Sequence, residues 1–588
     1  MEHETFSDEA AAERLNQVCV CVKVDREERP DVDALYMESC VMLTGGGGWP
    51  LSVFMMPDKR PFFAGTYYPP DAFVRILARI EGLWKTERKR LTDASDGLMD
   101  ALRESPAGAR EKEFSAEEAE AMAREAYLSL AESYDAQYGG FGRAPKFPSV
   151  HTLMFLERYG QLHPNTPARA MGRYTLERMA MGGLFDHVGG GFFRYSVDRF
   201  YKIPHFEKML YDNAQMAVVY AEAGLYETAG RVLDFCFREM RSPEGAFYTA
   251  LDADSEGREG AYYLLRREDL RVLGEDAQRY AEWFDITDTG NYEGENLPNL
   301  LSFGPLGERE KEMAKRGHAS LLAKRNERVR PMRDEKVLLS SNGLMLGSLA
   351  TCGRLMRRAE LVDAAVMLAA FLRDNLRRDG RYYAVYYEGK LGPHKATSDD
   401  YAYFAWGLYR LHQATLDEQW LTLCGEVCEE MLRLFLDRDG LLFLSGGDVT
   451  DLPLNTKNLQ DGALPSGNAM AAGVMRRLFI LTGEVRWKTA SERMFSAMLR
   501  QARRYPPAYT AALSAALLAG HGRKLELPAA GSAERRNLCD VTEGFYPFAC
   551  VRQGRGERAQ VCTEKACLPS TGDPEVLKCM LHPPFQKS

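Results

Sequence analysis

The sequence predicts a chain that combines two structural classes, a short α/β domain followed by a large domain of paired α-helices. Three observations support this. The chain has 588 residues, which is too many for one compact core. Up to about Leu91, short strand-like apolar runs alternate with helical periodicity. From Glu117 to Gly520, long helical patterns alternate with glycine turns that carry paired aromatic residues.

The N-terminal part shows strand, helix, glycine-rich turn, two strands and a closing helix. The expected strands cover residues 18–25, 51–58 and 60–68, and the expected helices cover residues 30–43 and 71–91. Four glycines followed by Trp49 and Pro50 favour a cis proline at a substrate-facing turn. The order matches the C-terminal part of a thioredoxin fold. We therefore predict an incomplete thioredoxin-like domain over residues 1–103, with Trp49 and Pro50 as candidate ligand-binding residues, and a polar linker over residues 104–118.

The helical part has a coarse repeat of roughly 50 to 60 residues, which is the length of a helical hairpin plus a short β-hairpin. The pattern predicts about twelve to fourteen helices, enough for six or seven antiparallel pairs. Six such pairs closed in a ring form an (α/α)6 toroid, which we assign to residues 119–525, followed by a cysteine-containing extension over residues 526–588. In such a ring the glycine–aromatic turns gather at one end. Their aromatic side chains can stack on sugars there or simply pack the turns against the helices.

The densest group of chemically active residues lies between Gly182 and Ala214. Glycines 189–191 supply turns, and a helix expected after Pro204 would place Glu207 and Tyr211 on one face with Asp212 beside them. The candidate catalytic residues here are Asp186, His187, His205 and Glu207, and the candidate substrate-binding residues are Phe192, Tyr195, Tyr211 and Asp212. The alternative is a buried turn in which His and Asp bond to backbone groups.

Further acidic residues lie at other turns of the helical part. Asp252 and Asp254 begin a segment that resembles a calcium loop, but Tyr263 occupies the twelfth position where a bidentate Glu is required. These two residues can therefore form an acid and base pair or cap a hairpin. Asp399 and Asp400 precede Tyr401 where a helix begins, so N-capping explains one of the two acids and leaves the other for the pocket. We take Asp399 as a candidate catalytic residue and Asp400 and Tyr401 as candidate substrate-binding residues.

Composition excludes several classes of protein. A net charge of −9, with a pI of 5.8 and no basic patch, argues against a nucleic-acid partner. No run of apolar residues is long enough to span a membrane, which leads us to expect a cytoplasmic protein. The twelve cysteines do not form a disulfide framework, and most are expected to be reduced. No cofactor fingerprint and no metal-ligand spacing is found, so we expect neither a cofactor nor a metal.

If the ring is catalytic, its chemistry depends on carboxylates and histidines. Two reactions fit these groups. One is cleavage of a glycosidic bond by a pair of carboxylates, and the other is proton transfer next to a carbonyl by a histidine acting as base and acid. Both imply a small, carbohydrate-like ligand.

Several motifs resemble one known family along nearly the whole chain, that of the spermatogenesis-associated protein 20 type. Residues 6–70 resemble its thioredoxin-like domain, and the match continues through GGFGRAPKFP, DHVGGGFFRYSVD, PHFEKMLYDNA, ALDADSEG, SSNGLM, DDYAYF, DGALPSGNAMA and CTEKACLP. The resemblance implies a thioredoxin-like domain fused to a toroid of the six-hairpin glycosidase type, similar to N-acylglucosamine 2-epimerases. It implies no settled reaction.

The sequence departs from the family in two places. The family has a Cys-His-Trp-Cys type motif immediately before the segment that corresponds to the start of this chain, so the expectation is a truncated gene or a misassigned start codon. Thiol exchange needs that low-pKa cysteine, and its absence counts against the alternative function, a redox or protein-folding factor with an unknown protein partner. Ser341 stands where relatives usually have Trp. A noncatalytic scaffold is the third alternative.

Overall fold

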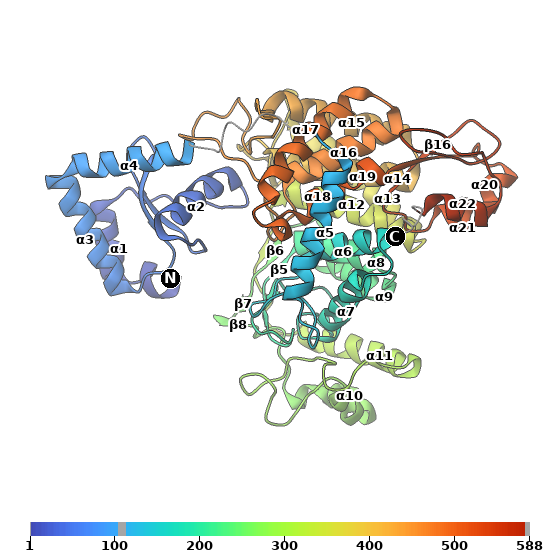
Figure 1. The fold of residues 1–588 in the computed structure, drawn as a ribbon. Helices are drawn as coiled ribbons and strands as arrows, with labels where there is room; N and C mark the ends of the chain where they lie inside the picture. Colours follow the sequence, from blue (N-terminus) through green and yellow to red (C-terminus); the bar gives the residue numbers. More distant parts are fainter. Residues whose placement is uncertain (1, 104–112, 583–588) are drawn as a thin grey trace. The chain divides into compact units, whose positions relative to one another are not determined.

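The computed structural model describes residues 2–103 and 113–582, and these residues form two compact units (Figure 1). The first unit contains residues 2–103 together with residues 434–437 and 442–458. The second contains the other described residues. Most of the expected linker, residues 104–112, lies outside the described residues. Its last three residues, 116–118, are the first turn of helix α5, and the hydroxyl of Ser115 caps that helix.

The first unit is built on one antiparallel strand pair and four α-helices within residues 2–103. Its elements are a π-helical turn Glu2–Phe6, α1 Glu9–Val18, α2 Pro30–Thr44, β1 Ser52–Met55, β2 Pro61–Gly65, α3 Pro70–Thr86 and α4 Arg88–Arg103. Pro30 is the first residue of α2, where its missing N–H would have no helical partner. In β1 and β2, Val53 lies opposite Ala64. The Trp49–Pro50 bond is cis, as the sequence predicts.

Two predictions for this unit are wrong. Residues 19–25, expected as part of a buried strand, have no regular structure, and Val20 and Val22 are 94% and 77% exposed. The reason is that a strand needs a partner, and among the described residues no strand pairs with this segment. The single helix expected over residues 71–91 is two helices, since α3 ends at Thr86 and α4 begins at Arg88.

Residues 442–458 lie between two helices of the second unit in sequence but pack with the first unit. Asp31 at the start of α2 accepts a hydrogen bond from the Ser445 hydroxyl at 2.8 Å. Arg29 forms an ion pair with Asp451 at 2.9 Å, and Lys59 donates to the carbonyl oxygen of Asp451. These polar contacts attach residues 442–458 to the first unit. No periodicity in the sequence indicates this packing.

The second unit contains a closed ring of helices, as the sequence predicts. Six inner helices contact one another in the order α6, α8, α12, α14, α16, α18 and back to α6, within residues 113–582. The inner helices are α6 Val150–Leu162, α8 Leu210–Glu222, α12 Leu339–Leu355, α14 Ser398–Thr415, α16 Gly467–Thr482 and α18 Thr510–Ala516. An outer helix precedes each one, namely α5 Ala116–Ser133, α7 Ala168–Met181, α9 Tyr226–Phe235, α13 Ala359–Asn375, α15 Glu418–Phe435 and α17 Val485–Ala502 (Figure 1).

Burial separates the inner from the outer helices. Every residue of α8 is buried, and in α12 all residues except Ser340 and Arg354 are buried. A helix that is covered all round must be rich in apolar and small residues, which is why these sequences lack a polar face. The predicted glycine–aromatic turns connect five of the six outer helices, all but α17, to the next inner helix, so they lie at the N-terminal ends of the inner helices.

Asparagine side chains clamp two of these turns in the same way. Asn213 and Asn342 are each the fourth residue of an inner helix. The amide oxygen of Asn213 accepts from the Phe192 N–H at 2.7 Å, and its NH₂ group donates to the carbonyls of Phe192 and Met209. Asn342 repeats this pattern on the backbone of Phe247. In α14 the hydroxyl of Tyr401, also the fourth residue, accepts from the Tyr382 N–H at 3.1 Å.

Short strands lie in the connections between the helices of the ring. Two further segments, an insertion between α9 and α12 and the C-terminal extension, add to the second unit. The strand pairs are β3 Tyr195–Ser196 with β4 Pro204–His205, β7 Asp254–Ser255 with β8 Arg258–Glu259, and β11 Arg377–Arg378 with β12 Arg381–Tyr382. The three-stranded sheets are β5 Lys208–Met209, β6 Ala250–Leu251 and β9 Arg333–Asp334, and β10 Val337–Leu338, β13 Val385–Tyr387 and β14 Lys390–Leu391. An insertion between α9 and α12 carries 3₁₀ helix Arg267–Asp276, α10 Ala277–Trp283 and α11 Glu308–Arg325 around its own apolar cluster.

The C-terminal extension forms a small mixed sheet. Strand β15 Arg523–Leu527 lies between β16 Ala549–Gln553, which is parallel to it, and β17 Gln560–Cys562, which is antiparallel. Helices α20 Ala533–Asn537, α21 Cys539–Thr542 and α22 Pro574–Leu581 accompany it, and Leu525, Val561 and Leu577 are in its core. Cys562 and Cys567 form a disulfide, whereas nine other cysteines among the described residues are free.

We expect the Asn342→Ala variant to lower the free energy of unfolding by about 2–4 kcal/mol, since it leaves the buried N–H and carbonyl of Phe247 without their partner. Denaturant titration of the full chain measures this. The matched control is Asn375→Ala, which removes one hydrogen bond to the Phe371 carbonyl. Equal effects of the two variants would refute the clamp.

Candidate functional site

The N-terminal ends of the inner helices meet at one end of the ring. The Ser340 N–H at the start of α12 donates to Asp400 in α14 at 3.1 Å, and His151 in α6 bonds to the hydroxyl of Thr510 in α18 at 2.8 Å. The Gln215 amide in α8 donates to the carbonyl of Ala463, just before α16. The glycine–aromatic turns therefore gather at this end of the ring, which we call the mouth.

His205 is held at this mouth between two carboxylates. It lies on β4, where it pairs with Tyr195 of β3. Its Nδ1 is 2.7 Å from Oε1 of Glu259, and its Nε2 is 3.6 Å from Oε2 of Glu207. The ring centroids of Tyr195 and His205 are 5.2 Å apart, and Phe147 in turn lies 4.7 Å from Tyr195. Because 28% of the His205 side chain is exposed, a ligand can reach it.

The two carboxylates determine the protonation of His205. Burial lowers the pKa of the imidazole, but Glu207 and Glu259 outweigh burial and raise this pKa to about 9. The hydrogen bond from His205 lowers the pKa of Glu259, and His205 with Arg194 lowers the pKa of Glu207 against the effect of burial. At neutral pH the arrangement is thus an imidazolium between two carboxylates.

Arg194 connects this group to the start of α8. Its guanidinium donates to Oε2 of Glu207 at 2.6 Å. Burial lowers the pKa of Arg194, whereas the neighbouring Tyr211, Glu207 and Asp212 raise it overall. Tyr211 and Asp212 therefore lie near the His205 group, although the expected helix after Pro204 is wrong. Residues 204–205 and 208–209 are strands, and α8 begins only at Leu210, because their backbone groups pair with β3 and β6.

Asp186 and His187 lie in the protein interior. The carboxylate of Asp186 binds Lys208 at 2.8 Å and both terminal nitrogens of Arg325 at 2.9 Å. Burial raises the pKa of Asp186, but Arg325 and Lys208 hold it well below its ordinary value. Burial and then Arg231 lower the pKa of His187 to about 4, and its Nε2 bonds to the Gly182 carbonyl. The burial and hydrogen bonds of Asp186 and His187 agree with the alternative interpretation, in which these residues stabilise a buried turn.

The other predicted acids occupy two different places. Asp254 pairs with Glu259 across β7 and β8, so it lies next to the partner of His205, and Asp252 accepts from the Asp254 N–H. Asp399 packs against Gly467 at the start of α16. Asp400 completes a capping box with Thr397, which is the actual N-cap of α14. Burial raises the pKa of Asp400.

Three predicted ligand-binding residues have structural partners. Phe192 is fully buried and stacks on Tyr220, and the hydroxyl of the buried Tyr401 donates to Glu430. Trp49 belongs to the first unit, where its indole N–H donates to Asp33 at 2.7 Å and Arg26 covers its ring. Pro50 follows it through the cis bond.

Sequence reasoning missed Arg194, Glu259 and Phe147. Glu259 lies 54 positions from its partner His205, and no local pattern links them. The only available signal was the β-hairpin around Asp254, whose second strand contains Glu259. Among residues 2–103 and 113–582, no group of His, Cys, Asp and Glu is arranged to hold a metal ion. No helix of this part of the chain is long and apolar enough to cross a membrane.

The raised pKa of His205 makes a prediction about pH. Its folded-state pKa of about 9 exceeds the ordinary 6.5, so the ion pairs stabilise the fold fully below pH 6.5 and lose this effect as pH rises through 9. We expect the difference in unfolding free energy between the native protein and His205→Gln to shrink over that interval. NMR titration of labelled histidines checks the pKa directly, and Glu259→Gln should lower it. A His205 pKa near 6.5 would contradict the geometry.

We expect Asp186→Asn to lower the free energy of unfolding by about 3–5 kcal/mol, because it leaves Lys208 and Arg325 buried without their carboxylate. Thermal and denaturant unfolding measure the loss. Asp252→Asn, which changes an exposed acid, is the control and should have little effect. An unchanged stability of the Asp186 variant would remove the structural explanation for this residue.

Comparison with known proteins identifies relatives over most of the chain. A family model described as "Protein of unknown function, DUF255", of the DsbH thioredoxin type, matches residues 1–103. Spermatogenesis-associated protein 20 of Mus musculus is 34% identical over 574 residues, covering 86% of this chain and 72% of the relative. The Homo sapiens protein is 34% identical over 584 residues, covering 88% and 74%.

Solved structures with a similar arrangement include a sugar epimerase from a ruminal bacterium, with a TM-score of 0.45 and 11% identity over 66% of this chain and 87% of that one. Cellobiose 2-epimerase from Bacillus thermoamylovorans has a TM-score of 0.44 and 10% identity over the same shares. The identity to the mammalian proteins, over most of both chains, decides the family. This chain belongs to the spermatogenesis-associated protein 20 family.

Proposed function

We propose that the mouth of the ring binds a small, carbohydrate-like molecule and that His205 and Glu207 transfer protons on it. The observation that carries this proposal is the His205 imidazole, partly exposed and held between Glu207 and Glu259. A charged histidine between two carboxylates, beside an accessible aromatic pair, is typical of a site that moves protons on a polar ligand.

The protonation states favour one of the two reactions that the residues allow. A glycosidase needs one carboxylic acid whose pKa is raised so that it can protonate the leaving group. Here the pKa values of both Glu207 and Glu259 are lowered. The site therefore fits proton transfer next to a carbonyl better than cleavage of a glycosidic bond.

In this reaction Glu207 takes a proton from the carbon beside a carbonyl, and His205 donates its proton to the carbonyl oxygen. The product is an enediol, and return of a proton to carbon restores a carbonyl compound with no net gain or loss of protons. Arg194, bound to Glu207, keeps this carboxylate ionised and oriented. Glu259 orients the imidazole through Nδ1 and leaves Nε2 toward Glu207.

Aromatic faces near His205 suit the apolar face of a sugar. Phe147 is 46% exposed and packs on Tyr195, which in turn packs on His205. Stacking on such rings and hydrogen bonds to the hydroxyl groups would orient the ligand over the imidazole. Asp212 acts electrostatically on Arg194, and Asp254 lies opposite Glu259 across β7 and β8, so both are candidates for binding hydroxyl groups. Our proposal retains the expected cytoplasmic location.

The thiols of the first unit offer less support for the alternative, a redox function. A nucleophilic cysteine needs a lowered pKa. Burial and the neighbouring Cys21 raise the pKa of Cys19, and burial raises the pKa of Cys21. Proton transfer at the ring is therefore the better supported function.

The test is solvent deuterium exchange into mono- and disaccharides, chosen by a binding screen on the full chain. We expect the His205→Ala, Glu207→Gln double variant to lower the exchange rate by about 10²–10⁴-fold, since it removes both proton-transfer groups. The control is His163→Gln, which removes a histidine paired with Glu120 elsewhere in the ring. Unchanged binding and exchange in the double variant would refute the assignment, and binding without exchange in the native protein would indicate a noncatalytic scaffold.

A further inference from the structure

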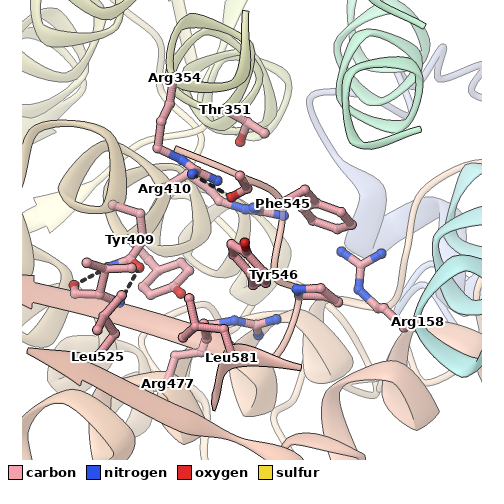
Figure 2. A pocket seen from close by; sticks show the side chains of 15 residues that line it. Arg158, Thr351, Arg354, Tyr409, Arg410, Arg477, Leu525, Phe545, Tyr546 and Leu581 are labelled. Atoms are coloured by element: carbon pink, nitrogen blue, oxygen red, sulfur yellow. Dashed lines mark hydrogen bonds between the residues drawn. The ribbon is translucent and has the colours of Figure 1, made fainter. Parts of the chain in front are cut away.

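Four arginines gather near the C-terminal ends of the inner helices. Arg158 lies on α6, Arg354 on α12, Arg410 on α14 and Arg477 on α16, and all four line one pocket. Since the N-terminal ends of these helices form the mouth with His205, this pocket lies at the other end of the ring. Figure 2 shows the four side chains around the rings of Phe545 and Tyr546, which come from the C-terminal extension.

The positive charge of this pocket exceeds the negative charge beside it. Glu222 accepts from Arg158 at 3.0 Å and from Arg410 at 2.8 Å. None of the described residues that line the pocket is acidic, and Glu222 is shared by two of the four arginines, so positive charge exceeds negative charge here. The carboxylate of Glu543 pairs with Arg357 at 2.7 Å.

Arg354 and Arg477 also bond to backbone carbonyl oxygens. Arg354 donates to the carbonyls of Glu543 and Gly544, and Arg477 donates to the Gly473 carbonyl at 2.9 Å. No carboxylate of the described chain pairs with Arg477, and the buried Nε of Arg410 has no hydrogen-bond partner there. A guanidinium has five donors in a planar fork, so these two side chains retain donors that could reach a ligand.

Helix ends alone do not account for this arrangement. The partial negative charge at a helix C-terminus favours cations and thus helps to explain why arginines occur here. The helix C-terminus does not, however, provide two acceptor oxygens for the guanidinium group of Arg477, which donates to the carbonyl of Gly473. Consistent with an excess of cations, burial and then Arg410 lower the pKa of Arg354 to about 10, and burial lowers the pKa of Arg477.

We propose that this pocket binds a phosphate-type oxyanion, either as the free ion or as the phosphoryl group of a small metabolite, with Arg410 and Arg477 as its principal ligands. Planar guanidinium groups match the oxygens of such an anion. The rings of Phe545 and Tyr546 lie beside the arginines, and the guanidinium carbon of Arg158 is 5.8 Å from the centroid of the Phe545 ring. The bound anion would link the C-terminal extension to the helices, which makes the stability of the protein depend on the anion.

The test is isothermal titration and thermal unfolding of the full chain with sodium phosphate, against sodium chloride at matched ionic strength. We expect phosphate, at about 10 mM or below, to bind and to raise the melting temperature. Arg477→Gln should weaken phosphate binding about tenfold or more, since it removes a charged fork from the site. Arg486→Gln, which changes an exposed arginine on α17, is the control and should leave binding unchanged.

Several outcomes decide the proposal. If Arg477→Gln does not fold, the titration of the native protein still decides, and absence of saturable phosphate binding there would overturn the site. Equal weakening by Arg477→Gln and Arg486→Gln would also overturn it. Tighter binding of glucose 6-phosphate than of inorganic phosphate would identify a phosphoryl group as the ligand, and the reverse would identify the free ion. Arg477→Gln should weaken the binding of glucose 6-phosphate, whereas any binding of glucose itself, which would take place at the mouth, should not change. The proton-transfer proposal is unaffected by either failure, because His205 and Glu207 are not changed.

Discussion

The closed ring of inner helices is the constraint on which the rest of the second unit depends. Each inner helix contacts two other inner helices and is also covered by outer helices, so that in α8 no residue remains exposed. Polar groups at such helices must find partners inside the protein. Asn213, Asn342 and Tyr401 do so by bonding to the backbone of the preceding turn, which gives each turn a defined position at the mouth.

Because the inner helices are parallel, acidic and basic side chains are distributed differently between the two ends of the ring. Helix N-termini favour acids and helix C-termini favour cations. Accordingly, Asp212 and Asp400 lie in the first turns at the mouth, whereas Arg354 lies in the last turn of α12 at the other end. The two proposed sites follow this division. The mouth contains the imidazole and carboxylates suited to proton transfer, and the opposite end contains guanidinium groups suited to an anion.

The candidate site was predictable only in part. Clustering along the chain brought His205 and Glu207 together correctly, because they lie two residues apart. The same clustering also selected Asp186 and His187, which the fold buries among Lys208, Arg325 and apolar rings. The local sequence could not distinguish the accessible pair, His205 and Glu207, from the buried pair, Asp186 and His187. Burial depends on residues such as Arg325 that lie far along the chain.

By itself the sequence determined the class of each part, the six helical pairs and the turns that join them, because periodicity and glycine placement act over short distances. Only the tertiary structure decided that residues 204–205 and 208–209 are strands, that residues 19–25 are not, and that Glu259 holds His205. Each of these depends on a pairing partner distant in sequence, whose presence no local pattern reveals.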